Sequence, residues 1–362
     1  MRAGLVICGN IDTVSGGFLY DRMLVDCLED HGDTVDIIPL PWVDHRQALR
    51  HHGDARIREA LLSWRGDILI EDKLAHASLH LLNAELRAAV GVPLVSIVHH
   101  LWASEGHGWL RSRGHVSVEK RYLQSVDAFV FNSKTTRHTV ESLLGAAVRG
   151  VIATPGGDRL GPGPSEEEIA RRCVEPGPLR ILFIGNVIPR KGVLALIEAL
   201  GLLAADRWRL TIAGSQAMDP ACTARIEAAI AARRMTKNVH WAGALGDAPL
   251  SQALRTHHVL AVPSRYEGFG IVTLEAMGFG VVPVATRAGG TMEIVDEGSG
   301  LLIAPGNVRA LARAVAELAE NRTRLLALAR GSVRRFGSFA GWRESMETAR
   351  GFLLVTAERK GA

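Results

Sequence analysis

The chain has 362 residues, of which 47% are hydrophobic and 22% are charged. This balance excludes a disordered chain, and the length predicts two domains because a single hydrophobic core rarely grows so large. The net charge of +4 suits an anionic ligand or loose attraction to an anionic membrane surface, while the absence of a basic block or stripe argues against nucleic acid.

Neither a membrane span nor a zinc site is expected. No stretch of the sequence is long and apolar enough to cross a bilayer. The four cysteines are far apart and form no Cys-x-x-Cys pair, which fits reduced thiols. We therefore expect a cytoplasmic protein. The sequence also allows peripheral contact with the inner face of the membrane.

Short apolar runs alternate with helical patterns along the chain, which predicts parallel sheets covered by helices. In the first half we expect helices at Phe18–His31 and Ala77–Val90. The expected strands there are Gly4–Cys8, Val35–Pro39, Asp67–Ile70, Leu94–Val98, Ala128–Phe131 and Gly150–Ala153.

Between Pro155 and Pro178 the composition changes, since five of the 14 prolines fall in this segment. Such a segment predicts an interdomain linker without a buried strand or a long helix. The alternation then resumes, with helices expected at Pro220–Arg234, Val308–Leu318 and Phe339–Glu358. The expected strands are Arg180–Ile184, Leu210–Ala213, Val239–Ala242, Val259–Val262, Val281–Val284 and Leu301–Ile303.

The sequence thus predicts an α/β protein with two Rossmann-like domains, 1–170 and 171–338, facing each other across a cleft. The C-terminal segment 339–362 is expected to form a helix that packs back on the first domain. Ligands of such sheets bind beyond the carboxyl ends of the strands, so the loops at those ends are where functional residues are expected.

The segment 263–277 carries the main motif. Glu267 and Glu275 are separated by seven residues, and Gly268, Phe269 and Gly270 follow the first of them. A glycine-rich turn from a strand into a helix leaves backbone N–H groups for a diphosphate, and the two glutamates suit sugar and ribose hydroxyls. The alternative is that Glu267 caps the helix and Glu275 is solvated surface.

This segment resembles the Glu–seven residues–Glu signature of the retaining glycosyltransferases of family 4, which have the GT-B fold, and 289–303 is similar to the stretch that follows it. The resemblance implies that Glu267 and the backbone of Gly268–Gly270 hold the transferred sugar. It also implies that Glu275 holds the ribose, while the backbone of Ile271 and Val272 faces the phosphates.

The segment 184–192 resembles the phosphate loop of the same family. The resemblance implies that Lys191 neutralises the donor diphosphate; the alternative is a solvated lysine at a helix start. Asn186 stands where the family often has arginine, so one positive contact is missing unless Arg190 compensates for it. We also expect the loop of Leu245 to contact the nucleotide base.

Two weaker matches lie in the first half. Gly16 and Gly17 resemble the family's glycine-rich loop, and His99 takes the place of a histidine that binds the sugar near the reacting carbon; the alternative is a structural histidine. His100 replaces the family's usual aspartate. The segment Trp102–Val118, which includes His107, is a candidate acceptor lip.

The resemblance implies a retaining hexosyltransferase that uses a nucleotide-sugar donor and an acceptor hydroxyl on a sugar, a lipid or another small molecule. Glu267, Lys191 and His99 are the expected catalytic residues. No Asp-x-Asp motif occurs in the chain, so we expect neither a metal nor another cofactor. An epimerase of the same fold and a non-catalytic nucleotide-sugar-binding protein remain as alternatives.

Overall fold

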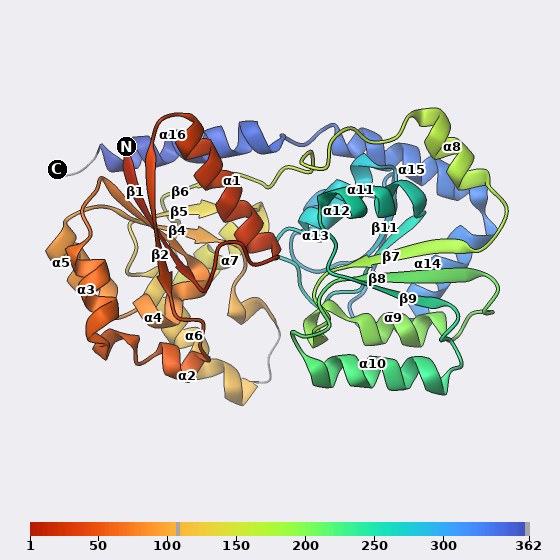
Figure 1. The fold of residues 1–362 in the computed structure, drawn as a ribbon, viewed down its shortest axis with the longest axis horizontal. Coiled ribbons are helices and arrows are strands. Elements are labelled where there is room, and N and C mark those ends of the chain that lie inside the picture. Colours follow the sequence, from red (N-terminus) through yellow and green to blue (C-terminus); the bar gives the residue numbers. More distant parts are fainter. Residues whose placement is uncertain (106–108, 359–362) are drawn as a thin grey trace. The chain divides into compact units, whose positions relative to one another are not determined.

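The computed structural model describes the backbone of residues 1–105 and 109–358, and the side chains of residues 1–103 and 114–358. Contacts divide the chain into two compact units (Figure 1). One unit contains Met1–Pro155 and the C-terminal segment from Trp342, and the other is Gly156–Gly341. The boundary expected at residue 170 differs, since it falls inside a helix of the second unit that begins with a capping box formed by Ser165 and Glu168.

The first unit is built on a six-stranded parallel sheet with the order β2-β1-β3-β4-β5-β6. Its strands are β1 (Arg2–Cys8), β2 (Thr34–Leu40), β3 (Ile68–Asp72), β4 (Leu94–Val98), β5 (Ala128–Phe131) and β6 (Gly150–Ile152). Its α-helices are α1 (Gly16–Asp30), α2 (His45–Ala48), α3 (Ala55–Ser63), α4 (His76–Leu79), α5 (Leu82–Val90), α6 (Trp109–Leu123), α7 (Lys134–Leu144) and α16 (Trp342–Ala357). Three short 3-10 helices are η1 (His51–Gly53), η2 (Lys73–Ala75) and η3 (Trp102–Glu105).

The second unit has another six-stranded parallel sheet, with the order β12-β11-β10-β7-β8-β9. Its strands are β7 (Leu179–Ile184), β8 (Trp208–Ala213), β9 (Val239–Gly243), β10 (Val259–Val262), β11 (Val282–Thr286) and β12 (Leu301–Ile303). Its helices are α8 (Glu166–Val174), η4 (Pro189–Lys191), α9 (Val193–Leu200), α10 (Pro220–Ala232), α11 (Asp247–Thr256), α12 (Ile271–Gly278), α13 (Thr291–Ile294), α14 (Val308–Glu320) and α15 (Arg322–Phe336).

The central strands of both sheets are buried on two faces, which explains why they are apolar runs rather than alternating patterns. In β7, Ile181 and Phe183 join the core cluster that contains residues of α9 and α10. Leu182 joins the opposite cluster, with residues of α11 and α12. Figure 1 shows these two pairs of helices on opposite faces of the second sheet.

The predicted strands are all present, with bounds shifted by no more than two residues. The helix expected at Ala77–Val90 is instead divided into α4 and α5. The Nδ1 atom of His80 bonds to the carbonyl oxygen of Ala77 at 2.9 Å. In an uninterrupted helix that carbonyl would accept from the N–H of Leu81, so the side chain competes with the backbone where the helix breaks.

The C-terminal helix α16 belongs to the first unit, where it packs against α1. Arg350 on α16 pairs with Asp33 at 2.7 Å, and Arg149 donates to Thr356 at 2.9 Å. Across the described residues, none of the helices combines the length and the apolar character that crossing a bilayer requires.

Each sheet has a topological switch point, where the chain connections leave in opposite directions from two neighbouring strands. In the first sheet it lies between β1 and β3, and in the second between β7 and β10. The loops that leave the carboxyl ends of these strands carry most of the predicted site residues. The fold therefore gathers them at one edge of each sheet.

Candidate functional site

The turn after β10 fixes the side chain of Glu267 inside the second unit. Glu267 is only 7% exposed, and its Oε1 accepts from the Nζ of Lys191 at 2.7 Å and from the Oγ of Ser264 at 2.5 Å. Its backbone pairs with that of Gly289. A Cβ at position 289 would lie 1.9 Å from the Glu267 carbonyl oxygen, so glycine is required where the two turns meet.

Lys191 reaches this carboxylate from the loop after β7, the strand next to β10. The loop closes through Gly192, whose φ is +74° and whose added Cβ would lie 2.2 Å from the carbonyl oxygen of Pro263. Arg190 in the same loop donates to the carbonyl oxygen of Tyr266 at 2.9 Å. The loops after β7 and β10 are thus joined by a buried ion pair and by close backbone packing.

The charges around Glu267 keep it ionised. Burial alone would raise its pKa, but the charges of Lys191 and Arg190, with the hydrogen bonds from Lys191 and Ser264, outweigh burial and hold the pKa below its ordinary value. A buried carboxylate that carries its charge at neutral pH can accept hydrogen bonds from a ligand's hydroxyl groups.

Helix α12 begins directly after this turn and leaves amide groups open to a ligand. Its N-terminal cap is Gly270, with φ of +105° and no side-chain capping bond. The N–H groups of Ile271 and Val272 have no hydrogen-bond acceptor among the described residues. Unpaired amides and the positive end of the helix dipole attract anions such as phosphate. The alternative in which Glu267 caps this helix is therefore wrong.

Glu275, one turn into α12, is fully buried rather than solvated. Its Oε1 accepts from the Nε of Arg159 at 2.6 Å, while its Oε2 has no hydrogen-bond partner among the described residues. Arg159 also pairs with Asp247 at the start of α11. Burial raises the pKa of Glu275, and the charge of Arg159 opposes that rise.

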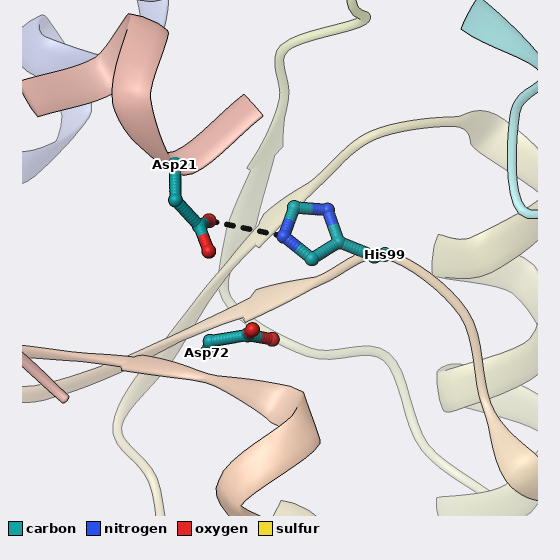
Figure 2. A group of neighbouring side chains, drawn as sticks. All are labelled: Asp21, Asp72 and His99. Carbon is teal, nitrogen blue, oxygen red and sulfur yellow. Dashed lines mark hydrogen bonds and ion pairs between the residues drawn. The ribbon is translucent and has the colours of Figure 1, made fainter. Parts of the chain in front are cut away.

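In the first unit, three titratable side chains converge near the switch point of the sheet (Figure 2). Asp21 lies on α1, Asp72 ends β3 and His99 follows β4. The Nε2 of His99 lies 3.0 Å from the Oδ1 of Asp21. The Oδ2 of Asp21 has no hydrogen-bond partner among the described residues.

The pKa values of Asp72 and His99 are shifted by burial and by the charges of their neighbours. Burial, followed by the charge of Asp21, raises the pKa of Asp72 to about 7. Burial alone would lower the pKa of His99, but Asp21 and then Asp72 outweigh burial and raise it. Among the side chains that the structure describes, this is the group of histidine and acidic residues compact enough to hold a metal ion. The same geometry serves equally to orient the imidazole.

The glycine loop of the first unit packs directly on this histidine. Ser15 caps α1 by accepting from the N–H of Phe18 at 3.2 Å, so Gly16 and Gly17 form the first turn of that helix. A Cβ on Gly17 would lie 3.2 Å from the His99 ring. The glycine therefore lets the helix approach the ring closely.

Two family models match this chain. Residues 165–332 match the family described as glycosyl transferases group 1, and residues 19–156 match glycosyltransferase family 4. The glycogen synthase of Mycobacterium tuberculosis strain CDC 1551 / Oshkosh is 28% identical over 305 residues, which cover 82% of this chain and 70% of that protein.

The protein is a glycosyltransferase.

Solved structures show that this glycosyltransferase has the GT-B fold. Sucrose-phosphate synthase from Thermosynechococcus elongatus superposes with a TM-score of 0.83 at 19% identity, covering 99% of each chain. The Anabaena protein Alr3699/HepE, solved in complex with UDP-glucose, gives a TM-score of 0.77 at 18% identity, covering 98% of this chain and 100% of that one.

Several of the site residues proposed from the sequence belong to the second unit of this glycosyltransferase. The loop of Asn186, Arg190 and Lys191 is joined to the turn of Glu267, as described above. The side chain of Phe269 is buried in an apolar cluster with Leu274, so only its backbone is available to a ligand. His107 of the candidate acceptor lip lies outside the described residues.

Leu245 and Gly268 belong to the same edge of the second sheet. Leu245 is partly buried against a core cluster, and it lies in the loop that leads to Asp247 at the start of α11. The carbonyl oxygen of Gly268 would lie 2.4 Å from a Cβ on Gly290, so this turn also depends on close backbone packing.

Four residues of these sites were not found from the sequence. Ser264 lies within the quoted motif, three residues before Glu267, so a signal was present. Asp72 stands at the carboxyl end of a strand and Asp21 four residues after Gly17, which are weak signals. Arg159 lies in the segment interpreted as a linker, where nothing in the sequence marks it.

Proposed function

We propose that this glycosyltransferase moves a hexose from a nucleotide-sugar donor to an acceptor hydroxyl, with retention of configuration and without a metal or another cofactor. The observation that carries the proposal is the buried Lys191–Glu267 pair on a turn that leads into the uncapped start of α12. The bound UDP-glucose of the Anabaena protein supports a donor of this chemical class.

The donor diphosphate takes Lys191 and the N–H groups of Ile271 and Val272 as its partners. When the donor binds, Lys191 pairs with a phosphate group instead of with the Glu267 carboxylate. Glu267 is then free to accept hydrogen bonds from hydroxyl groups of the sugar. Negative charge grows on the diphosphate as it departs. These fixed positive groups therefore stabilise the transition state more strongly than they stabilise the bound donor.

In the proposed transfer step, no residue of the protein forms a covalent bond to the sugar. The bond between the anomeric carbon and the diphosphate oxygen breaks, the acceptor oxygen bonds to the same face of that carbon, and the acceptor proton goes to a phosphate oxygen. The resemblance to retaining enzymes supports this course. The chain's residues contribute orientation and electrostatics.

Replacing Glu267 with glutamine tests the proposal. The variant keeps the shape of the side chain but loses its charge, and we expect turnover to fall by about 100-fold or more. Release of nucleoside diphosphate measures turnover, after a thermal-shift screen of UDP-, ADP- and GDP-sugars has selected the donor. Glu297→Gln, which changes an exposed glutamate of the same unit, is the control. Near-normal turnover of the Glu267 variant would contradict the assignment.

A chelator tests metal independence. Because Lys191 and the start of α12 supply positive charge, we expect excess EDTA to leave the rate of nucleoside diphosphate release unchanged. Loss of activity that magnesium restores would show that these groups do not suffice. In that case Asp21, Asp72 and His99 would be the first ligands to test by substitution.

A further inference from the structure

Arg159 connects two acidic residues that come from separate elements of the second unit. It precedes α8, in a segment for which the proposed mechanism has no role. Its Nε lies 2.6 Å from the Oε1 of Glu275 on α12, and its Nη1 pairs with Asp247 at the start of α11. Its side chain is only 14% exposed. We infer that Arg159 is the positioning residue of the nucleoside subsite, holding Glu275 by Oε1 so that Oε2 accepts the donor's ribose hydroxyls.

The inference rests on the proposed function and extends it to a residue outside the Glu–seven residues–Glu motif. Its basis is the different state of the two Glu275 oxygens. Oε1 is engaged by the guanidinium, whereas Oε2 is buried and has no acceptor role among the described residues. A buried carboxylate oxygen without a donor is costly. Ribose hydroxyls are donors of the kind that Oε2 lacks.

The ion pair between Arg159 and Asp247 fixes the orientation of the guanidinium towards Glu275. A guanidinium is planar and rigid, so engaging Asp247 with one nitrogen while Nε engages Glu275 restricts rotation about the arginine side chain. Burial alone would lower the pKa of Arg159, but Glu275 and Asp247 outweigh burial and raise it. The cation is therefore permanent, and it keeps the buried carboxylate in one orientation.

A purely structural role is the competing explanation, in which Arg159 only joins its loop to α11 and α12. The two roles differ in what a ligand senses. Loss of a structural contact weakens binding of all nucleotides to the same extent. Loss of a positioning residue removes the additional affinity that the ribose hydroxyls provide. The affinity for a nucleotide that lacks those hydroxyls stays almost unchanged.

Calorimetry with two ligands separates these outcomes. The ligands are UDP and 2′,3′-dideoxy-UDP, or the ADP or GDP pair if that nucleotide binds more tightly. In the wild-type protein we expect the dideoxy compound to bind at least roughly tenfold more weakly than UDP, because it cannot make the hydrogen bonds to a charged acceptor. In Arg159→Leu the ratio of the two dissociation constants falls towards one, because UDP binds more weakly and the dideoxy compound does not.

Three further variants complete the test. In Glu275→Gln the ratio of the two dissociation constants should likewise fall towards one. In Arg159→Lys the ratio should lie between that of Arg159→Leu and that of the wild-type protein. Arg171→Leu, an exposed arginine of α8, should keep the wild-type ratio. If Arg159→Leu fails to fold, Asp247→Asn takes its place, because it frees the second anchor while leaving the arginine and Glu275 intact. We expect it to lower the ratio.

The possible failures are distinguishable. A ratio that stays at its wild-type value while both ligands bind more weakly to Arg159→Leu would reduce Arg159 to a structural contact and overturn the inference. Equal affinity of the wild-type protein for both ligands would remove the ribose role of Glu275, and the inference with it, while leaving the diphosphate site intact. Failure of the wild-type protein to bind any nucleoside diphosphate would overturn the proposed function as well.

Discussion

Replacing Lys191 with methionine removes the cation of the Lys191–Glu267 pair while keeping the side-chain length. The pair is close, at 2.7 Å, and its side chains are 18% and 10% exposed. Removing one partner of a buried pair costs about 3–5 kcal/mol. Ser264 and the charge of Arg190 remain beside Glu267, and Lys191 is not fully buried, so we expect a loss of about 2–3 kcal/mol in unfolding free energy.

Thermal melting measures this loss, and its pH dependence identifies the cause. For a unit of this size the loss lowers the melting temperature by about 4–12 °C. The wild-type pKa of Glu267 is depressed, so its stabilisation is present above the unfolded value of about 4.3 and is lost as the pH falls through the folded pKa. We therefore expect the two melting temperatures to differ most at neutral pH and to converge only as the pH falls below about 4.3.

A second substitution decides whether the reasoning is right. Without Lys191, Glu267 is a buried charge that has lost the cation bonded to it, so adding Glu267→Gln to Lys191→Met should recover most of the lost stability. Additive losses in the double variant would refute the claim that the two side chains are electrostatically coupled. A difference in melting temperature that is independent of pH would refute it as well.

Three smaller predictions concern other parts of the structure. Asp21→Asn removes the nearest charge that raises the pKa of His99, so NMR titration should give a lower imidazole pKa, and an unchanged value would contradict the pairing. Arg172→Met removes the donor to four backbone carbonyls, three of them in buried hydrogen bonds; we expect a loss of at least about 3 kcal/mol in a melting experiment, and a loss under about 1 kcal/mol would show that water replaces the guanidinium. Gly192→Ala and Gly306→Ala both place a side chain at positive φ, but only the first meets a backbone oxygen at 2.2 Å, so it should lower the melting temperature more, and equal losses would count against the clash.

The strands could be predicted from the sequence because each sheet is covered on both faces. In β4 all five residues are buried, which produces a continuous apolar run that is easy to recognise. The helix break at His80 could not be predicted, because it depends on which carbonyl oxygen that side chain reaches in three dimensions. The domain boundary expected at residue 170 also differs from the division after Pro155, because the proline-rich segment contains a helix with a capping box.

Part of the candidate site could be proposed from the sequence. Glu267 was proposed from the glycine-rich turn that follows a strand, and Lys191 from the family resemblance of its loop. Adjacent parallel strands bring such loops together. Arg159 was missed because a loop residue's partners depend on tertiary structure rather than on local pattern. Asp72 was missed because it acquires its perturbed environment only when α1 and the loop after β4 close over it.

The most direct test of the central claim is a crystal structure of the protein with a nucleoside diphosphate bound. The account predicts the two phosphates within hydrogen-bonding distance of the Lys191 Nζ atom and of the backbone nitrogens of Ile271 and Val272. In the same complex the Oε2 of Glu275 should accept from the ribose. A nucleotide bound at another part of the second unit, with Lys191 still paired to Glu267, would contradict the account.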